Sequence, residues 1–145
     1  MTGGRASRDK GMSEFQLQCA VVEHLRLRAA PNVYFCAIPM GENRNAVTGA
    51  RIKRMGGKAG APDLLFIIDG VACGLELKAG RGKLSAAQQE TAWAWMEAGG
   101  VYHVARNLDD ALELLTMWGA LAALRELRDE GLVDVPRLET VRESE

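Results

Sequence analysis

Two carboxylates and an amine are spaced in this sequence so that they could share one site. Asp63 follows a proline, and Glu76 and Lys78 come thirteen and fifteen residues later. Side chains alternate along a strand, so Glu76 and Lys78 would share one face of a strand while Leu77 points to the other. Two carboxylates suit a divalent cation such as Mg²⁺, and an ammonium group can stabilise charge that develops on a phosphate. The pattern therefore points to metal-assisted chemistry on a phosphate.

The residues between the two acids predict a β-hairpin. Apolar runs at 64–68 and 71–75 flank Asp69-Gly70, a dipeptide typical of two-residue hairpin turns. In such a hairpin Asp63 opens the first strand and Glu76 closes the second, so both carboxylates lie at its open end. A lone acid after proline is usually a turn residue, and a lone Glu-x-Lys is usually a solvated strand face. Burying such charges without partners or a metal is costly, which favours a site here.

The remaining elements follow from caps and periodicity. Ser-x-x-Gln capping boxes at Ser13 and Ser85 predict helices that run to about Ala29 and Ala98, and Asn107 begins a further helix. Apolar segments predict strands at 33–38 and 101–105. We therefore expect an α/β fold, with a small mixed four-stranded sheet flanked by helices on both faces.

Three segments resemble the VRR-NUC branch of the PD-(D/E)XK nucleases. They are Gly60-Ala61-Pro62-Asp63-Leu64, Glu76-Leu77-Lys78 and Leu84-Ser85-x-x-Gln88, and the resemblance extends over about residues 13–115. It implies the restriction-endonuclease-like core of order αβββαβα. It also implies an endonuclease that depends on Mg²⁺ or Mn²⁺ and hydrolyses the phosphodiester bonds of DNA, in the manner of a stand-alone phage-type member.

The same resemblance implies roles for individual residues. Asp63, Glu76 and the backbone carbonyl of Leu77 would bind the metal, and Lys78 would position the attacking water. Glu14 would be an accessory catalytic residue and the extra ligand if two metals bind. An acid near a helix N-terminus is, however, favoured by the helix dipole alone.

Two glutamines complete this set. Gln88 would be an accessory catalytic residue, and Gln18, which lies one helical turn after Glu14, is a weaker accessory candidate. The side chain of Gln88 has two open interpretations. It either only returns to the cap of its own helix or also orients a water or phosphate beside Lys78.

Charge is distributed unevenly along a chain whose net charge is −1. Residues 1–60 hold ten Lys and Arg against four acids, and residues 61–145 hold eight against fifteen. We read residues 40–61 as a loop that contacts the substrate, since long loops in compact domains are often functional. The basic residues that we expect to contact the DNA backbone are Arg44, Arg51, Lys53, Arg54, Lys58, Arg81 and Lys83.

The length of 145 residues suits one domain, which we place at 13–130 between a flexible tail at 1–12 and an acidic tail at 131–145. No apolar run is long enough for a membrane span or a signal peptide, so we expect a cytoplasmic protein without a membrane partner. No organic cofactor is expected. We predict that Trp93 and Met96 face the core, and that the cysteines (Cys19, Cys36 and Cys73) are reduced core residues.

The resemblance favours branched DNA, such as flaps or the four-way Holliday junctions of DNA repair, as the substrate. It also favours a homodimer, encoded by a phage or a prophage in a bacterial host. A restriction-type enzyme that cuts linear duplex stays open, and so does a DNA-binding module without turnover. A further alternative is an acidic interaction protein organised around its C-terminal helices.

Overall fold

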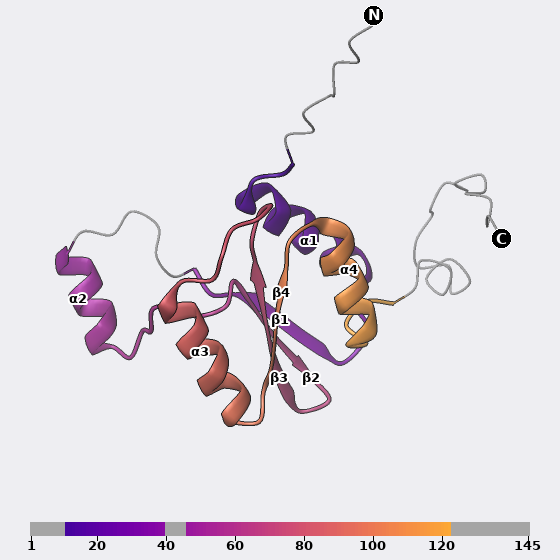
Figure 1. Ribbon diagram of the computed structural model, residues 1–145. Helices are drawn as coiled ribbons and strands as arrows, with labels where there is room; N and C mark the ends of the chain where they lie inside the picture. Colours follow the sequence, from indigo (N-terminus) through magenta and orange to yellow (C-terminus); the bar gives the residue numbers. More distant parts are fainter. Residues whose placement is uncertain (1–10, 40–45, 123–145) are drawn as a thin grey trace, which may run out of the picture.

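The computed structural model describes residues 11–39 and 46–122 and has a four-stranded sheet between helices (Figure 1). The strands are β1 (Val33–Ala37), β2 (Leu64–Ile68), β3 (Val71–Leu77) and β4 (Val101–Ala105). They lie in the order β1-β2-β3-β4; the first three are antiparallel, and β4 is parallel to β3. This mixed sheet confirms the predicted fold class.

Helices cover both faces of the sheet. They are α1 (Glu14–Arg28), α2 (Ala46–Arg54), α3 (Ala86–Glu97) and α4 (Leu108–Met117). The helices α1 and α4 contact each other and pack on one face, whereas α3 packs against β4 on the other face (Figure 1). The remaining helix, α2, lies at the left of Figure 1 and buries none of its residues.

The helices α1, α3 and α4 and the hairpin turn begin at the capping and turn residues that the sequence predicts. The side chains of Ser13 and Ser85 accept hydrogen bonds from backbone N–H groups three residues later, and both capping boxes are complete. Asn107 caps α4 in the same way. Asp69 and Gly70 both have positive φ, 50° and 77°, as the predicted two-residue turn requires. The β2–β3 hairpin is therefore confirmed.

The hydrophobic core lies between the sheet and the layer formed by α1 and α4. Its members on α1 are Leu17, Val21 and Leu25, one apolar stripe of that helix. On β3 the core includes Cys73, Leu75 and Leu77. Since strand side chains alternate, the residues between these, Gly74 and Glu76, lie on the opposite face, beneath α3.

The helix α2 corrects one prediction. Residues 40–61 were expected to form a loop, but residues 46–54 of that segment are helical. The segment was expected to be a loop because it is rich in glycine and charge, and the helix it forms buries no side chain. Its basic last turn is favourable for a helix C-terminus.

The orientation predicted for α3 was wrong. Trp93 is 64% exposed and Met96 is 48% exposed, so neither faces the core. Instead, Ala92 is buried, and the indole N–H of Trp95 donates a hydrogen bond to the carbonyl of Ala72 at 3.0 Å. The side of α3 that faces β3 is therefore the side of Gln88 and Trp95, which are seven residues, or two turns, apart.

The cysteine prediction holds only in part. All three thiols are free, but Cys19 is exposed, Cys36 is half-buried and Cys73 alone of the three lies in the core. The domain limits and the two tails stay predictions, because residues 1–10 and 123–145 lie outside the described residues. Among the helices at 11–39 and 46–122, none is both long and apolar enough to cross a bilayer.

Candidate active site

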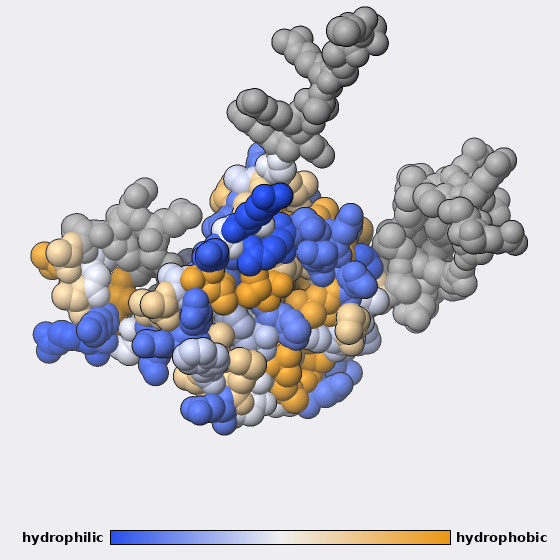
Figure 2. All heavy atoms as spheres, in the orientation of Figure 1, coloured by the Kyte–Doolittle hydropathy of each residue, from blue (hydrophilic) through white to orange (hydrophobic). Residues whose placement is uncertain are grey.

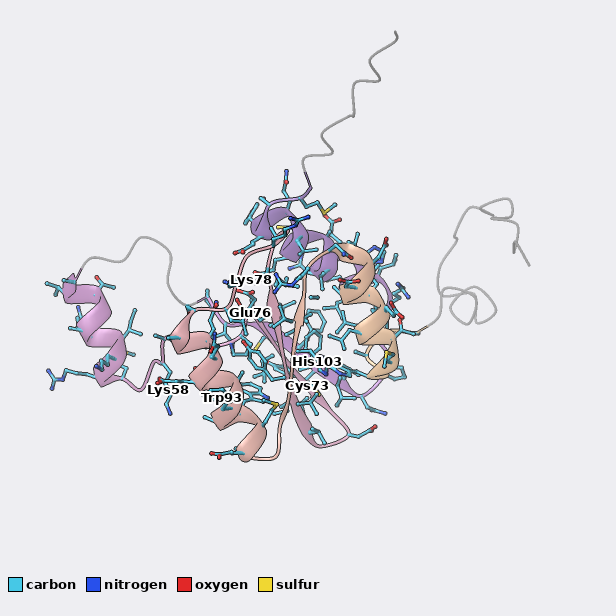
Figure 3. All side chains as sticks on the ribbon, in the orientation of Figure 1. Lys58, Cys73, Glu76, Lys78, Trp93 and His103 are labelled. Carbon is cyan, nitrogen blue, oxygen red and sulfur yellow. The ribbon has the colours of Figure 1, made fainter. Side chains whose placement is uncertain are left out.

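The two acids singled out in the sequence lie at the same end of the β2–β3 hairpin. Leu64 pairs with Leu75, so Asp63 and Glu76 are the next residues on the two strands. The Oδ2 atom of Asp63 accepts a hydrogen bond from the backbone N–H of Leu77 at 2.8 Å. Figure 3 shows Glu76 and Lys78 together at this end of the sheet. The strand pairing thus brings the predicted acids and amine to one place.

A tight contact with α3 holds the chain that leads into Asp63. Gly60 has φ of 81°, and a Cβ atom there would lie 2.3 Å from the carbonyl oxygen of Ala87, so no larger residue fits. The Thr91 hydroxyl donates to the carbonyl of Ala59 at 3.1 Å. These contacts bring the first turn of α3, with Gln88, beside the acids.

The Gln88 side chain joins the helix cap to the site. Its Oε1 atom accepts from the backbone N–H of Ser85 at 2.9 Å, while its Nε2 atom donates to Oε1 of Glu76 at 2.8 Å. The two interpretations of Gln88 are therefore not exclusive, since opposite ends of one amide serve the cap and the site. The group that this amide contacts is the Glu76 carboxyl, and a role beside Lys78 on water or phosphate stays a prediction.

Burial and neighbouring acids disfavour the charged forms of Asp63 and Glu76. Glu76 is only 3% exposed, and burial, followed by the charge of Asp63, raises its pKa to about 8. Burial also raises the pKa of Asp63, and the Leu77 N–H and the Lys78 ammonium oppose this. The charge of Glu14 adds to the rise at both acids. A bound cation would therefore be stabilised here.

The donor set fits a hard divalent cation. The Oε2 atom of Glu76 is buried beside the carboxyl of Asp63 and has no hydrogen-bond partner in the part of the chain that the structure describes. Within 11–39 and 46–122 there is no group of three or more His, Cys, Asp or Glu residues that could hold a metal. Mg²⁺ needs only one or two carboxylates, with waters and substrate oxygens in the other positions. The Asp63 and Glu76 pair meets that requirement, and the role of the Leu77 carbonyl stays a prediction.

The accessory candidates lie at the edge of the site. Glu14 is exposed in the first turn of α1, close enough for its charge to act on both acids. Gln18 is half-buried one turn later. Lys78 is half-buried too, and its backbone N–H donates to the carbonyl of Ala105 at 3.0 Å, which continues the β3–β4 pairing. The catalytic roles assigned to these three residues stay predictions.

Exposed basic residues lie on two segments, one on and after α2 and the other on the loop that follows Lys78. The last turn of α2 and the residues after it carry Arg51, Lys53, Arg54 and Lys58, all exposed. Figure 2 shows this hydrophilic end of α2 at the lower left. Arg81 and Lys83 are exposed on the loop that follows Lys78. Arg44 lies outside the described residues.

Sequence reasoning missed Arg106, which holds this loop in place. Its Nη1 atom donates to the carbonyl of Gly80 at 3.3 Å and also to the carbonyl of Gly82. Because these partners are 26 and 24 residues away, no local pattern could reveal the contact. Arg106 can be recognised only from the fold, because it directly follows β4 at the end of the sheet where the acids lie.

A groove of about 970 Å³ separates α2 from α3. Its α2 side includes Ile52, Lys53 and Lys58, and its α3 side includes Thr91 and Trp95. It extends to the contact of Gly60 with Ala87, two residues before Pro62. The groove therefore leads from the basic end of α2 to the segment that enters the site.

The double role of Gln88 can be tested against a second capping box. We expect Gln88→Ala to lower DNA cleavage at least tenfold and to cost about 1 kcal/mol of stability through the cap. Gln16 makes the same cap on α1 without a contact to Glu76, so Gln16→Ala should cost similar stability and leave activity unchanged. Chemical denaturation and initial cleavage rates provide the two measurements. If the two variants were equally active, the side chain of Gln88 would serve only as a helix cap.

Comparison with solved structures identifies a chain described as a "VRR_NUC domain protein". It is 24% identical to this chain, the TM-score is 0.63, and the alignment covers 75% of this chain and 89% of the other. Neither the protein-family models nor the curated proteins include a match. An identity of this level shows the fold and leaves the activity to be argued from the site. This chain therefore has the fold of that VRR_NUC domain protein.

Proposed function

We propose that this protein is a metal-dependent endodeoxyribonuclease that hydrolyses phosphodiester bonds. The observation that supports this best is the buried Glu76 carboxyl, whose Oε2 atom lacks a partner beside Asp63. A purely structural strand end would not bury a carboxyl beside a second acid whose charge raises its pKa. The VRR-NUC fold of the chain agrees with a nuclease.

Asp63 and Glu76 would hold Mg²⁺ or Mn²⁺, with the Leu77 carbonyl as a further ligand and Glu14 as the ligand of a second ion. The cation, when bound, supplies Lewis acidity toward the scissile phosphate and lowers the pKa of water.

Side chains and backbone groups of the protein orient the two acids and stabilise charge on the phosphate. The Gln88 amide holds Glu76 through Oε1, whereas Oε2 has no hydrogen-bond partner among the described residues. The Leu77 N–H fixes Asp63 through Oδ2. The Lys78 ammonium stabilises the negative charge that develops on the phosphate oxygens and orients the attacking water. Glu14 and Gln18 complete the outer site.

The proposed DNA interface consists of the two basic segments, one on and after α2 and the other on the loop that follows Lys78. The charges on α2 and after it would neutralise phosphates on one side, and the loop of Arg81 and Lys83 would do so on the other. Arg44 belongs to the same proposed set. The groove between α2 and α3 would give the backbone a path toward Asp63.

The finer assignment is a structure-specific enzyme on branched DNA, either flaps or four-way junctions, that acts as a cytoplasmic homodimer of phage or prophage origin. Two-fold symmetry would suit paired cuts on opposite strands. Restriction-type cutting of linear duplex and DNA binding without turnover are the competing outcomes of the test below.

Purified protein incubated with junction, flap and linear duplex of matched sequence provides this test. We expect cleavage that requires Mg²⁺ or Mn²⁺, that stops with EDTA, and that is at least tenfold faster on a branched substrate. Preference for linear duplex would favour the restriction-type alternative. Tight binding without cleavage in either metal would reject the enzymatic proposal.

A further inference from the structure

The phenol of Tyr102 is buried at the site without a hydrogen-bond partner. The residue is 7% exposed, and its Oη atom is among the buried polar atoms of the described residues that find no partner. Burying a hydroxyl without a hydrogen bond is unfavourable, and such groups normally have a protein or water partner. The unpaired hydroxyl therefore requires a partner that is not among the described protein groups.

The sheet places Tyr102 on the face of the two acids. In the parallel β3–β4 pair, Tyr102 lies opposite Gly74, and Gly74 shares its face with Glu76 two residues later. A Cβ atom on Gly74 would lie 3.2 Å from Cδ2 of Tyr102 and 3.0 Å from Cγ of Pro62. The Tyr102 ring thus lies over Gly74, against the proline that precedes Asp63.

The hydroxyl lies within electrostatic reach of both carboxyls. Burial raises the pKa of Tyr102, and the charges of Glu76 and Asp63 raise it further. The Gln88 amide already occupies Oε1 of Glu76, whereas Oε2 is buried without a partner. Two groups on this face of the sheet, the Tyr102 hydroxyl and Oε2 of Glu76, therefore lack a hydrogen-bond partner among the described residues.

We propose that Tyr102 is a positioning residue of the site, whose hydroxyl donates through one bound water to the Oε2 side of Glu76 and so orients that carboxylate for a divalent cation. The proposal rests on the proposed metal-dependent function. A water suits a polar pocket in which two unpaired groups do not touch each other. Partners of this kind, which hold a metal ligand in its orientation, typically change metal affinity by about 10–100-fold.

The Tyr102→Phe variant isolates the hydroxyl, because phenylalanine keeps the ring over Gly74. We expect the affinity for Mn²⁺, measured by titration calorimetry on metal-free protein, to fall about tenfold. Tyr34→Phe is the matched control, since Tyr34 is the other tyrosine of the chain and is 59% exposed on β1. It should bind Mn²⁺ as the wild type does.

A spectroscopic readout separates positioning from packing. With ring-¹³C tyrosine, Mg²⁺ should shift the NMR signal of Tyr102 and leave that of Tyr34 in place, with Tyr102→Phe assigning the signals. Wild-type Mn²⁺ affinity in Tyr102→Phe, or a Tyr102 signal that Mg²⁺ does not move, would overturn the inference. If the wild type cleaves DNA while either result holds, only this inference fails. If the wild type neither binds Mn²⁺ nor cleaves, the proposed function fails with it.

Discussion

Conservative replacement of either acid is expected to lower Mg²⁺-dependent DNA cleavage by about three orders of magnitude or more. In Glu76→Gln and Asp63→Asn the shape of each side chain is kept, but a negative charge that would bind the cation is lost. Lys78→Met should cost on the order of 10²–10³-fold, the usual effect of removing one group that stabilises transition-state charge. Initial rates of cleavage of the preferred substrate, at saturating Mg²⁺, measure all three.

Asp69→Asn is the matched control for the acid variants. It makes the same chemical change in the same hairpin, but in the β-turn at the opposite end, where Asn tolerates the positive φ. Its activity should equal that of the wild type. Circular dichroism and denaturation must show that each variant is folded. If folded Glu76→Gln or Asp63→Asn cleaves within tenfold of the control, the site has been assigned to the wrong residues.

The second large effect concerns the pH dependence of stability in EDTA. The pKa of Glu76 is raised from 4.5 to about 8 in the folded protein, so between these values the folded state binds more protons than the unfolded state. Stability must then fall as the pH rises through this window. The raised pKa of Asp63 acts in the same direction. We expect a melting temperature that declines between pH 5 and pH 8.

Glu76→Gln isolates the contribution of this carboxyl. The variant should flatten the decline and, at pH 8.5 in EDTA, be at least about 1 kcal/mol more stable than the wild type. His24 has a lowered pKa, which makes the protein less stable toward acid, but this contribution is common to both proteins. Mg²⁺ should stabilise the wild type at pH 8.5 and have little effect on the variant. Parallel pH profiles of the two proteins would contradict the pKa assignment for Glu76.

Much of the fold was predictable because its signals are local. The Asp69-Gly70 turn, the two Ser-x-x-Gln capping boxes and the Asn107 cap each depend on residues within a few positions of one another. Backbone preference and hydrogen bonding over such short separations act in much the same way in any fold. For this reason, the hairpin and the starts of α1, α3 and α4 were predicted correctly.

The errors occurred where packing, rather than local preference, decides. The helix α2 lies in a segment rich in glycine and charge, which favours a loop, and it has no buried residue. On α3 both Trp93 and Trp95 are large and apolar, and only the position of the Ala72 carbonyl beneath the helix selects Trp95. Similarly, the contact of Arg106 with the loop after Lys78 joins residues that only the sheet brings together.

By itself, the sequence determined which acids and which amine share a strand end, since strand alternation and a two-residue turn leave little freedom in where Asp63, Glu76 and Lys78 lie. Tertiary structure decided the surroundings of these groups. The approach of Gly60 to Ala87 sets Gln88 on Glu76, and the parallel pairing of β4 places Tyr102 on the same face of the sheet as Glu76. Burial by α3 and the neighbouring strands is what raises the pKa of Glu76, because desolvation depends on segments that are distant in the chain.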